Sequence, residues 1–169
     1  MAALAHPATQ EEMPRVAQTT REQVLEFLEH AGGGFDSGEW APGLVPAYHF
    51  WMRRIGREAG RPEIVGGINL RIGDGPNIER VIGHIGYHVY PFARGRHYAE
   101  RACRLLLPLA ATCGIDPVWI TCNPDNYASR RTCERLGGIL TEIVAVPEDH
   151  PLHARGETEK CLYRVDLAL

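Results

Sequence analysis

The sequence predicts an α/β (α+β) fold, with a mixed, mostly antiparallel central sheet and helices on both of its faces. Three strand-like segments follow one another with turns between them, which is typical of an antiparallel meander. A strand–helix–strand unit comes next, and a right-handed crossover there makes its two strands parallel. A further helix and two strands complete the chain, so helices and strands are mixed along its length.

The length and the composition of the chain favour one globular domain. The chain has 169 residues, 44 % hydrophobic and 23 % charged, which is enough for one domain with a real core. We expect residues 1–20 to be an N-terminal segment that is either loose or a first strand. Residues 21–169 are expected to form a single domain.

Charge and composition argue against several classes of protein. The net charge of −3 gives no support to nucleic-acid binding. No apolar run approaches the ~20 residues that span a bilayer, and no secretory signal opens the chain. The five cysteines, an odd number without a C-x-x-C pair, favour free thiols in a reducing compartment. We therefore expect a cytoplasmic protein.

Apolar spacing and turn residues place the elements of the first half. Residues 21–31 have helical spacing, and Gly32 to Gly34 end that helix. Aromatic or β-branched residues with turn clusters between them then predict three strands. The segments that follow the helix are a loop at 35–43, strands at 47–53, 63–72 and 79–90, and turns at 56–62 and 73–77.

The second half alternates helices and strands. The helix after Pro91 carries small and apolar residues at spacings of three and four on one face: Ala99, Ala102, Cys103, Leu106, Leu109, Ala110 and Cys113. Residues 118–122 form a short, continuous apolar run, which is typical of a strand that is buried on both faces. The polar residues Asn123 to Asn126, with Pro124 in the first turn, then start a helix that runs through Arg135. The last strands are expected at 139–146 and 161–167, with a polar loop at 147–160 between them.

The junction between strand 79–90 and the next helix is the most informative segment. The strand stops at Pro91, and Arg94, Gly95 and Arg96 stand just before the helix. The first amides of a helix lack internal partners, and the helix dipole favours negative charge there. The segment therefore predicts a cradle for an anion such as a phosphate.

These residues resemble the GNAT superfamily of acyl-CoA-dependent acetyltransferases over roughly residues 45–167. The family signature is a strand ending near V-x-P, followed by R/Q-x-x-G-x-G/A at the start of a helix. Val89-Tyr90-Pro91 and Arg94-Gly-Arg-His-Tyr-Ala99 fill it at the same spacing. Asn126 lies eleven residues before Gly137, as in the family's N…G pattern.

The resemblance implies that acetyl-CoA, or another acyl-CoA, is the donor. The amides of residues 94–99 would hold the pyrophosphate, and the end of strand 79–90 would pair with the pantetheine arm. The amide of Val89 or of its neighbour would polarise the thioester carbonyl, and Asn126 would bond or orient the pantetheine. The implied donor-binding residues are Val89, Arg94, Gly95, Arg96, His97, Tyr98, Ala99 and Asn126.

Two positions depart from the family pattern. His97 stands where the loop usually has glycine, so its side chain either contacts the pyrophosphate as an added donor or obstructs it. Cys133 stands where the family's general acid, a tyrosine, usually lies. It either replaces the phenol as the acid, since a thiol titrates near pH 8.5, or is a small core residue.

Histidines of strand 79–90 are the candidates for the base. His84, Gly86 and His88 share one face of the predicted strand, which abuts the thioester in the family. We interpret His84 as the catalytic base, with a structural histidine as the alternative. His49 on the neighbouring strand could face the same cleft, but no spacing is diagnostic of a metal site.

The expected function is acetyl-CoA-dependent N-acetylation of a small amine-bearing molecule by direct attack on the thioester. The alternatives are a CoA-thioester enzyme that decarboxylates, hydrolyses or O-acylates, and a non-catalytic acyl-CoA-binding module. Glu142 and the acidic loop 147–160 could attract a cationic amine. Relatives often pair through their last strands, so a homodimer is expected.

Overall fold

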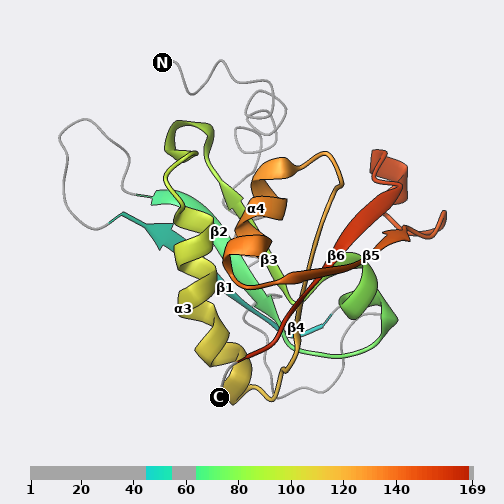
Figure 1. Ribbon diagram of the computed structural model, residues 1–169, viewed down its shortest axis with the longest axis horizontal. Coiled ribbons are helices and arrows are strands. Elements are labelled where there is room, and N and C mark those ends of the chain that lie inside the picture. Colours follow the sequence, from blue (N-terminus) through green and yellow to red (C-terminus); the bar gives the residue numbers. More distant parts are fainter. Residues whose placement is uncertain (1–44, 55–63, 168–169) are drawn as a thin grey trace, which may run out of the picture.

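The computed structural model describes residues 45–54 and 64–167 (Figure 1). The predictions for the N-terminal segment 1–20, the helix 21–31 and the loop 35–43 lie outside these residues, as does that for the turn 56–62. Among the helices that are described, none is long and apolar enough to cross a membrane.

The first sheet is the predicted meander. Its strands are β1 (Ala47–Arg53), β2 (Ile64–Arg71) and β3 (Ile85–Val89), in the order β1-β2-β3, and both pairs are antiparallel. β2 lies between its neighbours and is mostly buried, and its adjacent glycines Gly66 and Gly67 let β3 approach closely. A Cβ added to Gly66 would lie 2.2 Å from the carbonyl oxygen of His88. β3 is left as an edge strand of this sheet.

The predicted strand 79–90 is wrong over its first half. Asn77–Ile82 is a π-helical turn, and β3 begins only at Ile85. Ile78 and Val81 are both buried at helical rather than strand spacing. Gly83 follows with a positive φ of +71°, and a Cβ there would lie 3.0 Å from the Trp119 carbonyl oxygen and from the Thr121 nitrogen, so a larger residue would be strained and crowded.

The second sheet contains the last three strands. They are β4 (Val118–Cys122), β5 (Ile139–Ala145) and β6 (Glu159–Val165), in the order β4-β6-β5, all antiparallel. The expected single mixed sheet is thus two three-stranded antiparallel sheets. β3 and β4 share no strand ladder, and the His84 N–H donates to the Trp119 carbonyl (2.7 Å) where they meet.

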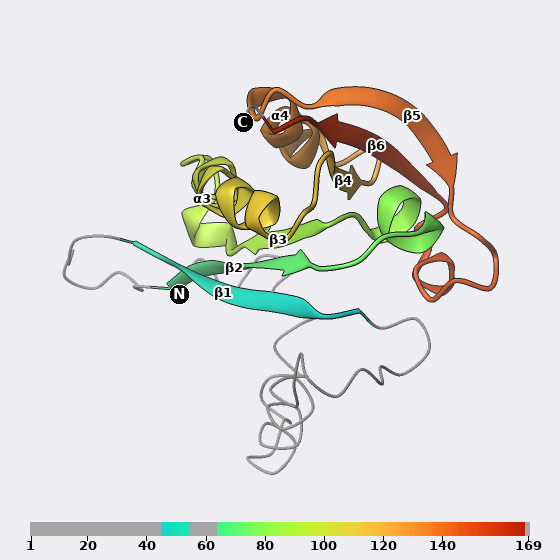
Figure 2. The ribbon, with the colours of Figure 1, turned by 90° about the horizontal axis from the view of Figure 1, so that it is seen from below.

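Two helices connect and cover these strands. Helix α3 (Tyr98–Thr112) links β3 to β4 and packs against β2 and β3. Helix α4 (Tyr127–Arg135) links β4 to β5 and packs against α3 and the second sheet. Figure 2 shows α3 lying above the first sheet, with α4, β5 and β6 at the top of the view. The end of β3 therefore leads into the start of α3, which lies beside the end of α4.

The core lies between α3, α4 and the two sheets. Leu70, Ile85 and Tyr163 are among its fully buried side chains. On α3, the predicted apolar face is confirmed by the burial of Cys103, Leu106 and Ala110. All five cysteines fall within the described residues and are unpaired, as expected for free thiols.

Candidate active site

The outer edge of β3 carries peptide groups that pair with no strand. The Arg71 N–H donates to the His84 carbonyl (2.8 Å), and the Tyr90 N–H donates to the Val65 carbonyl (2.9 Å). Along an antiparallel strand, the N–H and C=O groups of every second residue face a given neighbouring strand, and those of the residues between them face the other side. The peptide groups of Tyr87 and Val89 therefore point away from β2, toward the side on which the sheet has no further strand among residues 45–54 and 64–167.

A short loop carries the chain from this edge to α3. Pro91–Ala93 forms a 3-10 turn, and Gly95 takes a positive φ of +76°. Arg94 folds back, since its Nε donates to the Val89 carbonyl (3.1 Å). The loop is exposed from Arg94 to His97, so the predicted cradle faces solvent.

Helix α3 begins with amides that no side chain caps. Its first intrahelical bond runs from the Arg101 N–H to the His97 carbonyl (3.1 Å). The N–H groups of Tyr98, Ala99 and Glu100 consequently have no acceptor within the helix. The predicted anion cradle thus has both of its expected parts, a glycine-bearing loop and a row of helix-start amides.

His97 adopts the backbone conformation that glycine usually provides. Its φ is +57°, the only positive value of a non-glycine residue in the described chain. This αL conformation costs a side-chain-bearing residue free energy, so surrounding contacts must hold it. The His97 Nδ1 lies 2.6 Å from the Arg135 Nη1 and 3.5 Å from a Glu100 carboxylate oxygen.

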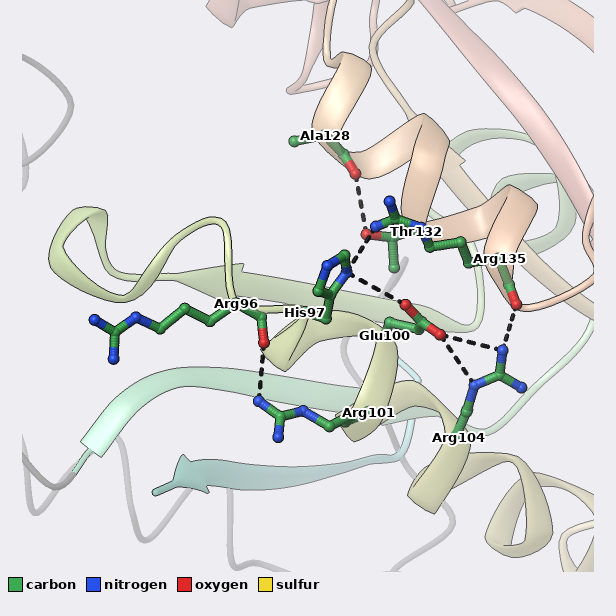
Figure 3. Close-up of polar contacts among 8 residues, drawn as sticks. All are labelled: Arg96, His97, Glu100, Arg101, Arg104, Ala128, Thr132 and Arg135. Atoms are coloured by element: carbon green, nitrogen blue, oxygen red, sulfur yellow. Dashed lines mark hydrogen bonds and ion pairs between the residues drawn. The ribbon is translucent and has the colours of Figure 1, made fainter. Parts of the chain in front are cut away.

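Arginines surround this loop (Figure 3). Arg104 donates to Glu100 (3.2 and 3.3 Å) and to the carbonyl of Arg135. Arg101 donates to the Arg96 carbonyl (2.9 Å) and lies over the Tyr98 ring. Both α3 arginines are exposed. Glu100 is the acid among these groups, so the cradle is positively charged and suits an anionic ligand.

Asn126 lies at the start of α4 and acts as its cap. Its side-chain oxygen accepts the Ser129 N–H (3.2 Å), as the polar sequence before the helix predicts. The side-chain amide keeps its N–H groups for another partner. The predicted contact with pantetheine therefore stays a prediction.

A contact that the sequence did not reveal joins β3 to α4. The Tyr87 hydroxyl lies 2.8 Å from the Ser129 hydroxyl. Burial is the main cause that raises the pKa of Tyr87 well above its ordinary value, so the phenol stays protonated at neutral pH. No local pattern signals this pair, because it depends on how α4 packs beside β3.

His84 lies at the bend before β3 rather than on a strand face, and it is 4 % exposed. Its Nδ1 accepts the Trp119 N–H (2.9 Å), and its Nε2 lies 3.1 Å from the Gly73 carbonyl, to which it donates. Burial lowers the pKa of His84, which keeps the ring neutral. With both nitrogens occupied, the ring has no lone pair for a substrate proton, and the geometry favours the structural alternative.

Cys133 is fully buried on the inner face of α4. Its hydrogen bond with Cys122 and its burial raise the pKa of the Cys133 thiol. A buried thiol with a raised pKa is a poor proton donor to a group in an open cleft. The geometry therefore favours the interpretation of Cys133 as a small core residue.

The remaining histidines and acids are spread over the surface. His88 is exposed on β3, and its ring lies over Gly67 and edge-on to Tyr90 at 5.3 Å. His49 is exposed on β1. In residues 45–54 and 64–167, no cluster of three or more His, Cys, Asp or Glu side chains could hold a metal ion.

Two of the acids expected to attract an amine are paired. Glu142 binds Arg80 at 2.8 Å, and Glu157 binds the buried Lys160. Glu148 and Asp149 are exposed in the loop that follows β5. The acidic attraction is therefore weaker than the sequence alone suggests.

Comparison with protein families identifies one match, a model described as "Acetyltransferase (GNAT) domain", over residues 1–139. A solved chain from Bordetella pertussis, assigned to the GNAT acetyltransferases, has the same fold. Its TM-score is 0.53 at 19 % identity, over 88 % of this chain and 78 % of that chain. We found no match among curated proteins.

Two further solved structures are similar over a smaller part. An acetyltransferase from Agrobacterium tumefaciens has TM-score 0.46 at 27 % identity, over 66 % of this chain and 57 % of that chain. A Salmonella typhimurium chain solved with acetyl-CoA has TM-score 0.47 at 17 % identity, over 62 % and 59 %. The matched part of this chain thus spans less than two thirds of either of these two structures.

Proposed function

The chain belongs to the GNAT acetyltransferase family, and we propose that it transfers an acetyl group from acetyl-CoA to the nitrogen of a small amine-bearing molecule. One observation carries the proposal. The peptide groups of β3 that face no neighbouring strand in the described chain lead directly into the positively charged loop and the first amides of α3, which no described side chain caps. This arrangement fits a ligand that has an extended chain with amide groups, which would lie along β3, and a diphosphate at one end, which would lie at the loop and the start of α3.

The donor binds both at the start of α3 and along the outer edge of β3. The pyrophosphate binds the amides of residues 95–99, with Arg94 and Arg96 beside it. The pantetheine arm pairs with the outer edge of β3, in the way an added strand does. Solved relatives containing acetyl-CoA support this choice of donor.

The reaction is direct attack of the amine on the thioester. The N–H of Val89, or that of its neighbour, stabilises the oxyanion that forms when nitrogen bonds to the carbonyl carbon. The C–S bond then breaks, and its electron pair stays on sulfur. The ammonium proton passes to a base, and the thiolate takes a proton from water.

We propose His88 as the base in place of His84. Its exposed imidazole lies on β3, one residue before Val89, whereas both ring nitrogens of His84 are occupied. A neutral imidazole is suited to this step because one of its ring nitrogens carries a lone pair that can accept the proton. The acceptor enters from the exposed face that carries His88.

Release of free thiol from acetyl-CoA, measured with and without a panel of small amines, tests the function. The proposal expects release that requires an amine. Release without any amine would instead indicate hydrolysis, and binding of CoA without release would indicate a non-catalytic module. O-acylation and decarboxylation are separated by the mass of the products.

Two expectations about the whole protein accompany this function. The free thiols suit a reducing compartment, so we propose a cytoplasmic location. We also propose a homodimer, supported by the edge strand β5, where Ile139, Leu140 and Ile143 are exposed. Sedimentation of the protein, and of a variant with Ile143→Lys, tests the dimer.

A further inference from the structure

A contact between two helices controls the ring of His97. Arg135 is the last residue of α4, and His97 directly precedes α3, yet the Arg135 Nη1 lies 2.6 Å from the His97 Nδ1 (Figure 3). The two residues are 38 positions apart in the sequence. The contact exists only because α3 and α4 pack against each other.

The chemistry of the two groups decides the direction of this hydrogen bond. A guanidinium group has only donors, so the His97 Nδ1 must be the acceptor. A neutral imidazole has one acceptor and one donor nitrogen. The ring proton of neutral His97 therefore resides on Nε2.

The surrounding groups keep this arrangement in place. Glu100, which also faces Nδ1, is bound by Arg104. Arg104 in turn donates to the carbonyl of Arg135 and so ties the end of α4 to α3. The charged groups that face the His97 ring are thus Arg135 from α4 and Glu100 from α3, with Arg104 behind the acid.

We propose that Arg135 is a positioning residue of the donor site, which fixes His97 as the Nε2–H tautomer so that its ring donates a hydrogen bond to a phosphate oxygen of the donor. The His97 side chain is 51 % exposed, so Nε2–H can meet a ligand. The positively charged loop selects an anionic partner. The ligand part of this inference rests on the proposed acetyl-CoA site.

The tautomer is tested in the free protein. Nitrogen-15 NMR of the His97 ring at about pH 8, where an unperturbed imidazole is neutral, should show the proton on Nε2. In Arg135→Ala the two tautomers should become mixed, whereas Arg131→Ala, an exposed arginine on the same helix, should leave the spectrum as in the wild type. A proton on Nδ1 in the wild type, or no change in Arg135→Ala, would overturn the proposal.

Calorimetric titration with CoA at the same pH tests the ligand part. Arg135→Ala and His97→Gly should each weaken binding about tenfold, the loss of one hydrogen bond to a charged group. In the double variant the second change should add almost nothing, since Arg135 acts through His97. If the two losses of CoA affinity add up in the double variant, Arg135 binds the ligand directly. If His97→Gly binds CoA more tightly than the wild type, the His97 side chain obstructs the ligand. Either result overturns the proposal.

A comparison with dephospho-CoA identifies the phosphate. Dephospho-CoA lacks the 3′-phosphate. If Arg135→Ala weakens the binding of dephospho-CoA as much as that of CoA, His97 bonds to the diphosphate. If Arg135→Ala leaves the affinity for dephospho-CoA unchanged, His97 bonds to the 3′-phosphate. Wild-type protein that binds no CoA, but shows the expected tautomer, would contradict the proposed function and the ligand part while leaving the contact itself established.

Discussion

His84 and Trp119 bond to each other twice. The backbone N–H of His84 donates to the Trp119 carbonyl (2.7 Å), and the backbone N–H of Trp119 donates to the His84 ring at Nδ1 (2.9 Å). These bonds join the two sheets at the point where β3 and β4 approach each other. Because the other ring nitrogen binds Gly73, His84 connects three segments of the chain and has no nitrogen left for catalysis.

The first prediction concerns stability. His84→Ala leaves the Trp119 N–H and the Gly73 carbonyl without their partner in a buried place, which should lower the free energy of unfolding by about 1–3 kcal/mol. Denaturant unfolding measures this loss. His49→Ala, which removes an exposed side chain of β1, is the control and should change stability little. Unchanged stability in His84→Ala, together with lost turnover, would restore the catalytic interpretation.

The second prediction concerns pH. Burial lowers the pKa of His84 in the folded protein below the ordinary value of 6.5. As pH falls through 6.5, the unfolded chain therefore takes up the proton first, and stability decreases until the lowered folded-state pKa is passed. His84→Ala should show a shallower decrease between about pH 7.5 and 5.5 than the wild type. Parallel curves would contradict the assignment.

The third prediction concerns the base. His88→Gln should reduce kcat/KM by about a hundredfold or more and remove the limb of the pH–rate profile near neutrality. The affinity for CoA should stay near the wild-type value, because His88 serves the acceptor. The matched control is His49→Gln, which changes another exposed histidine of the same sheet and should leave kcat/KM near the wild-type value. A profile with its neutral limb intact in His88→Gln would exclude His88 as the base.

The fourth prediction concerns the buried thiol. Cys133→Ala should keep kcat and cost about 1 kcal/mol of stability, a usual loss for one substitution. Activity is measured on the folded fraction, so that the two effects separate. A large fall of kcat with normal stability would show that Cys133 is the acid after all.

Much of the fold could be predicted because local patterns determine it. β1 and β4 begin and end at their predicted bounds, since turn residues and alternation mark them. α4 ends at the predicted Arg135 but begins only at Tyr127, after Pro124, which the sequence predicts in its first turn. The failure at Asn77–Ile82 has a local cause as well. Ile78 and Val81 fit a helical spacing, but the β-branched run around them favoured a strand.

The site was less predictable because its decisive contacts are tertiary. The loop that we propose to bind the donor could be found, since a strand, a glycine and a helix start are local signals. The roles of His84 and His97 depend on Trp119 and Arg135, which lie far away in the sequence. A basic residue in the last turn of a helix signals only a favourable helix dipole, so nothing in the sequence connects Arg135 with His97.

The central claim is that acetyl-CoA binds along the outer edge of β3 and at the start of α3. Titration of nitrogen-15-labelled protein with CoA, followed by the backbone amide signals, tests it most directly. The account predicts the largest shifts at Tyr87, Val89 and residues 95–99. No binding, or shifts confined to other parts of the chain such as β5, would contradict it.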